Sequence, residues 1–410
     1  MVASLVSAKR TQIIGWILLS FASLICAGVA YKYFSSAFPI IDITISMTRE
    51  EALTKAKGLV VAHQLQPQDG SQAARFATDS YTQYYVELEG GGVEAFRALL
   101  KDPDYTPYTW QVRVFKENSI PESTLMFKAD GTVYGFIQHL AKDAPGAALP
   151  ADEARELAVK QTSAWNIDLQ NYNLIESAQK TNPAGRIDHT FTYEHNTKKV
   201  GTAPFRIKLR VFGDVVTTAK RFIKVPEEFA RKYQEMRSAN NTLANAANQL
   251  INVLYLIIGI IGGIIFLFRR RMLLWKPALG WALFVGILSI IEKLNALPLL
   301  WFSYPTSVSA RLFLTNYLIR LITQVATTYG IFFGVFLVAE GLTRAAFGSQ
   351  PQFWKGWFSP PNGSNSLISR MVGSYLLVGV FIFYVVFTYL FASRFLGWWS
   401  PADTLYDPNI

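Results

Sequence analysis

The residues of this chain that could bind a metal ion are distributed so that no ligand set forms in its most apolar part. The chain has one cysteine, Cys26, and four histidines, all of which precede residue 249: His63, His139, His189 and His195. A catalytic zinc ion takes about three ligands from histidine, cysteine and carboxylate side chains. Residues 249–410 contain neither histidine nor cysteine. We therefore expect no catalytic, cofactor-binding or metal-ligating residue in this chain.

Two short patterns resemble sites but have simpler explanations. His189 and His195 lie six residues apart in a stretch that reads as a strand, where they would be about 20 Å apart and too distant to share an ion. Glu227-Glu228-Phe229-Ala230-Arg231 resembles the paired-glutamate and arginine motif of CAAX-type intramembrane proteases. The arginine here follows two intervening residues, whereas the family pattern has three. We interpret the segment as the solvated face of a helix.

The charge distribution points to a membrane rather than to nucleic acid. The chain is 51% hydrophobic and has a net charge of +10. Residues 34–248 contain 25 basic and 25 acidic residues, so the excess lies in the flanks of apolar segments. Nucleic-acid-binding proteins concentrate positive charge on a soluble face. We therefore exclude nucleic acid and expect the lipid bilayer as a partner.

Five segments are long enough to cross about 30 Å of hydrocarbon as helices. They are Ile13–Ala30, Leu250–Phe268, Leu273–Ile291, Leu321–Ala339 and Met371–Ala392. The first segment could also be a signal peptide. However, it is long, and the following Tyr31-Lys32-Tyr33-Phe34 is a poor cleavage site, which favours an uncleaved anchor.

The positive-inside rule then predicts one topology in a bacterial inner (cell) membrane. Arg269-Arg270-Arg271 ends the second span and marks the cytoplasmic side, and nine of the 14 basic residues outside 34–248 fall on that side. The predicted parts are a cytoplasmic N-terminus (1–12), a first span (13–33), an extracytoplasmic domain (34–248), spans two to five with short loops (249–393) and an extracytoplasmic tail (394–410).

The extracytoplasmic segment reads as two related α+β units, about 39–140 and 141–230, followed by a stalk helix at 226–248. Thr48 and Pro150 each precede acidic residues and an apolar-periodic stretch, which is typical of a helix start. Alternating strands follow at Tyr108–Phe115 and Phe205–Phe212, and Asp130-Gly131 is a strong hairpin signal. With one cysteine, no intrachain disulfide is available, so packing must hold the domain together.

A group of charges near the ends of the third and fourth spans is a candidate polar cluster: Glu292, Lys293, Arg311 and Arg320. Charges at membrane depth are costly and are usually paired or functional. The simpler interpretation is mutual neutralisation at the interface, and a role in substrate entry or ion passage is the alternative. Gly259, Gly262 and Gly263 on the second span predict a close contact with another helix.

The repeated helix and antiparallel strands of the extracytoplasmic segment resemble PepSY-type domains, which accompany membrane proteins and peptidases. In the apolar half, the resemblance rests on the aromatic and basic loop Val338–Phe347 and Pro351–Trp357, on Gly373-Ser374-Tyr375-Leu376 and on the tail Gly397–Pro401. These segments are similar to the region that precedes the catalytic core in large bacterial CPBP-family proteins, which are CAAX-protease and bacteriocin-processing intramembrane metalloproteases.

The resemblance implies a membrane-embedded endopeptidase that uses a metal-activated water. Its divalent metal, with zinc the first candidate, would belong to later helices that this chain lacks. We therefore expect a multi-pass α-helical membrane protein with an inserted α+β domain, the non-catalytic N-terminal region of such a protease, truncated near residue 410. The extracytoplasmic domain would bind a peptide or protein substrate. The alternative is a complete sensor or scaffold with a ligand-binding domain. A transporter would need inverted repeats and broken helices, which we do not find.

Overall fold

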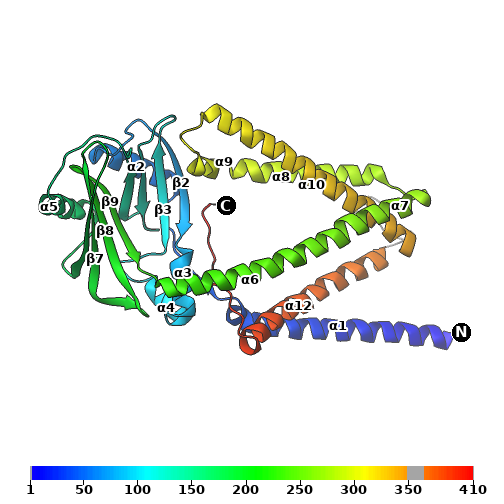
Figure 1. Cartoon of the computed structure of the whole chain (residues 1–410). Helices are drawn as coiled ribbons and strands as arrows, with labels where there is room; N and C mark the ends of the chain where they lie inside the picture. The colour runs from blue at the N-terminus through cyan, green and yellow to red at the C-terminus, as the bar shows by residue number, and fades with distance from the viewer. Residues whose placement is uncertain (1, 349–363, 410) are drawn as a thin grey trace. The chain divides into compact units, whose positions relative to one another are not determined.

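The computed structural model of the chain describes residues 2–348 and 364–409 (Figure 1). The predicted loop segment Pro351–Trp357 therefore lies outside the described residues. The chain forms two compact units. One contains Met1–Asp42 and Thr343–Leu405, and the other contains Ile43–Leu342 and Tyr406–Ile410.

The larger unit contains an eight-stranded antiparallel sheet in the order β2-β3-β4-β5-β9-β8-β7-β6. Its strands are β2 (Ser71–Thr78), β3 (Tyr108–Phe115), β4 (Glu122–Phe127), β5 (Val133–His139), β6 (Tyr172–Thr181), β7 (Ile187–Val200), β8 (Ala203–Phe212) and β9 (Val215–Ile223). The first four strands and the last four meet at β5 and β9, where Phe136 faces Ala219. Each half of the sheet follows its own helix.

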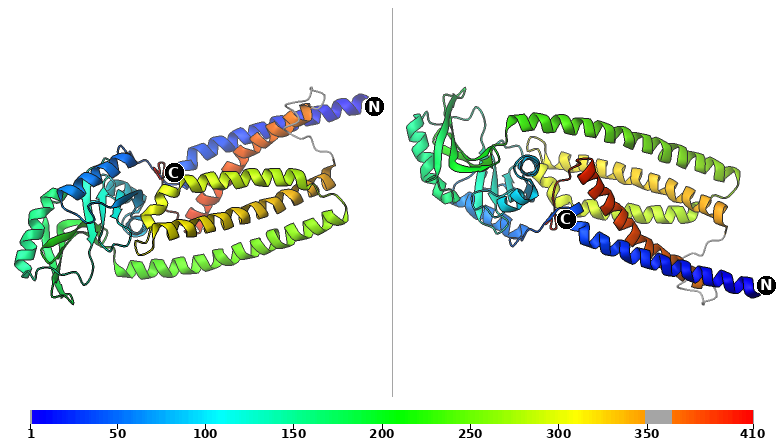
Figure 2. Two further views of the ribbon diagram at one scale, coloured as in Figure 1. Left: turned by 90° about the horizontal axis from the view of Figure 1, so that it is seen from above. Right: turned by 90° about the horizontal axis from the view of Figure 1, so that it is seen from below.

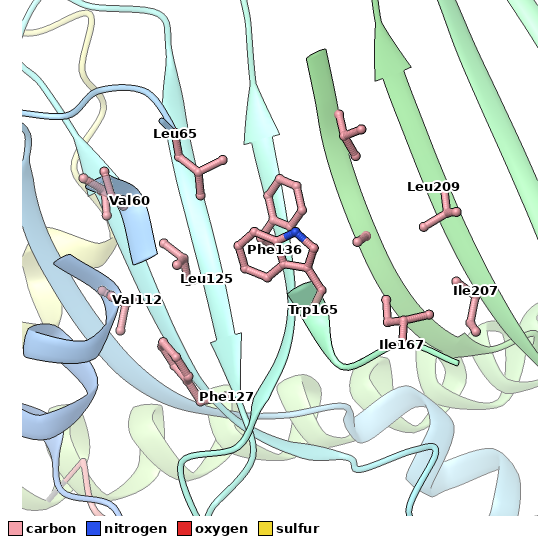
Figure 3. Packing of buried hydrophobic residues seen from close by; sticks show 14 of the residues in the cluster. Val60, Leu65, Val112, Leu125, Phe127, Phe136, Trp165, Ile167, Ile207 and Leu209 are labelled. Carbon is pink, nitrogen blue, oxygen red and sulfur yellow. The ribbon is translucent and has the colours of Figure 1, made fainter. Parts of the chain in front are cut away.

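Helices α2 (Arg49–Ala62) and α5 (Ala151–Thr162) begin where the sequence predicts. Thr48 caps α2 through a capping box, in which its side chain accepts from the Glu51 N–H and the Glu51 carboxylate accepts from the Thr48 N–H. Both helices supply buried residues to the core that covers one face of the sheet. In Figure 3, Phe136 and Trp165 stack at its centre, with ring centroids 4.0 Å apart.

Two further helices, α3 (Ser80–Leu88) and α4 (Gly92–Leu99), lie between β2 and β3 in the chain. A glycine-rich turn joins them, and Gly91 and Gly92 adopt φ values of +116° and +82°. These left-handed conformations are readily accessible only to glycine.

The larger unit also contains the second and third apolar helices and most of the fourth. The stalk α6 (Glu227–Ile251) continues without a break through a π-helix, η2 (Asn252–Ile261), into α7 (Gly262–Arg269). Helix α8 (Trp275–Asn295) follows, then the short α9 (Leu297–Leu300) and η3 (Trp301–Ser303), and then α10 (Ala310–Phe347).

Glycines allow η2–α7 and α10 to approach closely. A Cβ on Gly263 would overlap the Val338 side chain, and a Cβ on Gly334 would lie 2.8 Å from Ile260. Of the three glycines predicted at this contact, Gly263 lies at it. The space around Gly262 is open, and Gly259 contacts only its own helix.

The smaller unit pairs α1 (Val2–Ala37) with α12 (Ser364–Phe395), which lie side by side in Figure 2. The Ser23 hydroxyl donates to the Leu376 carbonyl at 2.6 Å, close to Gly379. A two-residue parallel ladder joins β1 (Ile40–Ile41) to β10 (Asp403–Thr404). The described residues include five helices that are long and apolar enough to cross a membrane, alongside an antiparallel α+β sheet domain.

Candidate functional sites of the sheet domain

A pocket of about 380 Å³ opens between α4 and the ends of β7 and β8. The β7–β8 ladder is irregular between Glu194 and Lys199, which displaces the intervening residues from regular pairing. The pocket is lined by Gly90, Ala95, Ala98, Leu99, Asp102, Thr197, Lys198, Lys199, Val200, Gly201 and Phe205. Its lining combines apolar side chains with one group of charges.

Lys198 is the central charge of this pocket. Its ammonium group lies 3.2 Å from Oδ1 of Asp102 and also pairs with Oδ2 of Asp104. Partial burial lowers the pKa of Lys198, but the hydrogen bonds to Asp104 and Asp102 outweigh it and raise the pKa overall. The ammonium group therefore remains charged and holds the 102–104 loop against the β7–β8 end.

Strand β9 carries a buried arginine, Arg221. Arg221 is only 8% exposed, and its guanidinium donates to the carbonyl of Tyr134 at 2.7 Å and to the carbonyl of Asn166. Among the described residues it forms no ion pair, and burial lowers its pKa. Burial also raises the pKa of nearby Tyr172 to about 12. Two backbone carbonyls fix the Arg221 guanidinium, which indicates a structural role for this arginine.

The four histidines do not form a common site. His189 is buried, with Nε2 2.9 Å from the Leu149 carbonyl oxygen, and His195 Nδ1 accepts from the Lys198 N–H at 3.0 Å. His63 packs on the Trp165 ring, and His139 ends β5. In the described part of the chain, no three histidine, cysteine or carboxylate side chains form a group that could hold a metal ion. The described residues therefore do not fit the zinc ion that the CPBP resemblance implies.

Arg113 is central to the contact between the sheet and the loop that joins α8 to α10 (residues 296–309). Arg113 on β3 donates from Nη1 to the carbonyl oxygens of Phe302 (3.0 Å) and Tyr304 (2.7 Å). Glu122 on β4 accepts from Arg113 Nε at 2.9 Å and holds the guanidinium in place. The Phe302 ring is also 4.0 Å from the guanidinium of Arg75 on β2.

Apolar packing and backbone bonds complete this contact. Tyr304 is 1% exposed and packs against Phe115 and Ala73. The Asn118 N–H donates to the Thr306 carbonyl at 2.8 Å. In the tail, Asn409 donates to and accepts from the backbone of Phe76 on β2, at 2.7 and 2.9 Å, much as a neighbouring strand would. The β2 edge of the sheet is therefore occupied by the chain itself.

The charges predicted as a polar cluster come together only in part. Lys293 pairs with Glu292 at 3.0 Å near the end of α8. Arg311 and Arg320 lie on α10, and among the described residues no ion pair joins either of them to Glu292. Tyr317 links the two helices instead, because its hydroxyl donates to the Lys293 carbonyl at 3.1 Å.

Arg113 and the pocket were not predicted from the sequence. The sequence does predict the strand Tyr108–Phe115. However, the alternation of residues along this strand indicates only which face Arg113 occupies, and it does not indicate which group Arg113 contacts. The available signal was the run Trp301-Phe302-Ser303-Tyr304, because a short aromatic segment between two apolar helices needs a surface to pack on.

No protein-family model matches the chain, and no curated protein matches it. Among solved structures, the chain is similar to the C-terminal domain of YpeB from Bacillus megaterium, at 11% sequence identity and a TM-score of 0.25. The match covers 44% of this chain and 69% of that chain. At this TM-score the similarity carries no argument about function.

Proposed function

We propose that this chain is the non-catalytic N-terminal region of a CPBP-like intramembrane metalloprotease, anchored in the bacterial cell membrane. Its PepSY-like sheet domain lies outside the cell membrane and binds polypeptide substrates. The observation that carries the proposal is the fixed attachment of the sheet to the spans. Arg113 holds the 296–309 loop, and α6 enters the second span without a break. A domain held in this way can present a bound chain at one position over the bilayer.

The pocket supports polypeptide as the ligand class. Its volume of about 380 Å³ suits one or two side chains, and Leu99 and Phe205 provide apolar surface. The Lys198 group adds a charged rim beside exposed backbone at Gly201. This combination suits amphipathic peptide segments better than a strongly charged small molecule.

The helix ends support the proposed orientation. The sheet contacts the loop that follows α8, whereas Arg269-Arg270-Arg271 lies at the far end of the α6–α7 helix from the sheet. A cytoplasmic arginine run therefore requires the sheet domain to lie outside.

Peptide binding is tested with the purified full chain and a fluorescent, permanently unfolded casein, by anisotropy. Ala98→Trp on α4 fills the pocket and is expected to weaken binding by at least about tenfold. Ala62→Trp, which changes an exposed alanine at the end of α2, is the matched control and should bind normally. Equal binding by both variants would remove the pocket from the proposal. Chelator-sensitive cleavage of the casein by this chain would overturn the proposal that the chain is non-catalytic.

The uninterrupted helix from Glu227 to Arg269 favours a second candidate, a sensor that transmits ligand binding through the stalk. The two functions differ in the size of the native protein. An antibody against the sheet domain should detect a band well above 46.0 kDa if a catalytic core follows. A band at 46.0 kDa would favour the sensor.

A further inference from the structure

The sheet has one edge that the chain leaves open. Strand β6 ends the strand order, and nine of its ten residues are exposed. Along its outer side it has no strand partner among the described residues. The opposite edge, β2, is engaged by Asn409 and, through Arg75 and Ala73, by the 296–309 loop. An edge strand of this length, with unpaired N–H and C=O groups, is a template for another strand.

The charged residues of β6 are complementary to those of a second β6 strand that runs in the opposite direction. Glu176 and Lys180 lie two residues before and two residues after Ala178, and all three share the face of the sheet that also carries Thr192. The ladder is regular from Glu176 to Thr181, because the irregularity with β7 lies before Glu176. In an antiparallel pair of β6 strands centred on Ala178, each Glu176 would face Lys180 of the second copy.

We propose that two copies of this chain associate through antiparallel pairing of their β6 strands about a twofold axis at Ala178, forming one continuous sheet. The contact is isologous, so the two Glu176–Lys180 pairs form together. Oppositely charged residues directly across an antiparallel pair are favourable, and like charges there are unfavourable. Ile175, which is 47% exposed in the single chain, would be partly covered at the same contact. The inference does not rest on the proposed function.

A cysteine at the axis provides the first test. In a Cys26→Ser background, which removes the native thiol, Ala178→Cys places two thiols opposite each other. Cα atoms paired across antiparallel strands are about 4.5–5.5 Å apart, within the range that a disulfide accepts. Oxidation of the full chain in membranes should give a band at twice 46.0 kDa that reductant removes.

Asn173→Cys is the matched control, because it is exposed on the same strand. About the proposed axis, its two copies would be about 33 Å apart, and they cannot form a disulfide. Equal crosslinking at both positions would indicate random collision and would overturn the pairing. Absence of the Ala178→Cys dimer, or an adduct with a different protein in its place, would also overturn it.

Charge reversal provides an independent measurement by sedimentation in detergent. Glu176→Lys and Lys180→Glu each place like charges opposite each other twice per dimer. We expect each single variant to raise the dissociation constant by about tenfold or more. The double variant restores opposite charges and should dimerise as the parent does. Failure of the double variant to recover, while it retains its far-ultraviolet circular dichroism, would contradict the proposed register.

Discussion

The guanidinium of Arg113 and the backbone carbonyl of Tyr304 form a 2.7 Å hydrogen bond across 191 residues of sequence. This bond joins a strand of the sheet to a loop between two apolar helices. The accepting carbonyl belongs to a residue whose side chain is fully buried against the sheet. The loop therefore cannot leave the sheet without exposing an aromatic ring and leaving a partly buried charge with fewer partners.

Arg113→Lys is expected to loosen this loop while the sheet remains folded. Lysine keeps the charge, but it lacks the planar fork that reaches both carbonyls and Glu122 together. We expect a loss of about 1–3 kcal/mol in the local opening free energy of the loop. Hydrogen exchange of the amides in residues 300–306 measures it.

Arg206→Lys is the control for this measurement. Arg206 also pairs with a glutamate on a neighbouring strand, at 2.7 Å from Glu194, and no contact joins it to the 296–309 loop among the described residues. Exchange in residues 300–306 should therefore be unchanged. A loop that exchanges equally in both variants would show that Tyr304 packing alone holds it.

Gly263→Ala should weaken the contact between the second and fourth apolar helices. The new methyl would overlap Val338, a β-branched residue whose rotamer is restricted, so the strain cannot be relieved by a side-chain rotation alone. We expect a cost of about 1–3 kcal/mol, seen as a lower thermal midpoint in detergent. The adjacent Gly262→Ala meets nothing within 4 Å and should be neutral or stabilising by up to about 1 kcal/mol. The same loss in both variants would point to the helix backbone rather than to the contact.

Local signals in the sequence predict individual helix starts, strands and turns. They do not predict contacts between residues that lie far apart in the chain. The Thr48 cap, the strand Tyr108–Phe115 and the Asp130-Gly131 turn depend on neighbouring residues, and the structure has each of them. Whether β5 pairs with β9 depends on residues about 80 positions apart, which periodicity does not encode. For the same reason Gly263 and Gly262 look alike in sequence, although only Gly263 faces α10.

Alkaline conditions should destabilise the sheet domain, with Tyr172 contributing. Burial raises the pKa of Tyr172 to about 12, above its ordinary value of 10.0, so the fold favours the neutral phenol. The unfolded chain loses that proton near pH 10, and this share of stability is lost as the pH rises from 10 to 12. The slope for one proton is at most about 1.4 kcal/mol per pH unit, and the half-exposed position of Tyr172 reduces it.

The substitution Tyr172→Phe measures the contribution of the Tyr172 phenol to this loss of stability at high pH. This phenol makes no hydrogen bond among the described residues, so the variant should match the parent at pH 8 to within about 0.5 kcal/mol. Between pH 10 and 12 its stability should fall less steeply, as followed by urea unfolding monitored by tryptophan fluorescence. The remaining slope would come from other groups, including Tyr105, Tyr134 and Tyr193, whose pKa values burial also raises. An unchanged slope would show that Tyr172 titrates alike in both states.

Removal of divalent metals should leave the stability of the full chain unchanged. A metal that binds the folded state raises the thermal midpoint, and a chelator lowers it again. The described residues offer no group of three ligands, His189 bonds a backbone carbonyl, and His195 accepts backbone N–H groups. We therefore expect thermal midpoints with chelator and with added zinc to agree within about 1 °C, because weak binding at single histidines contributes little. A chelator-dependent fall of several degrees would show that a metal site forms in this chain, and His189→Asn and His195→Asn would then identify which histidine contributes to it.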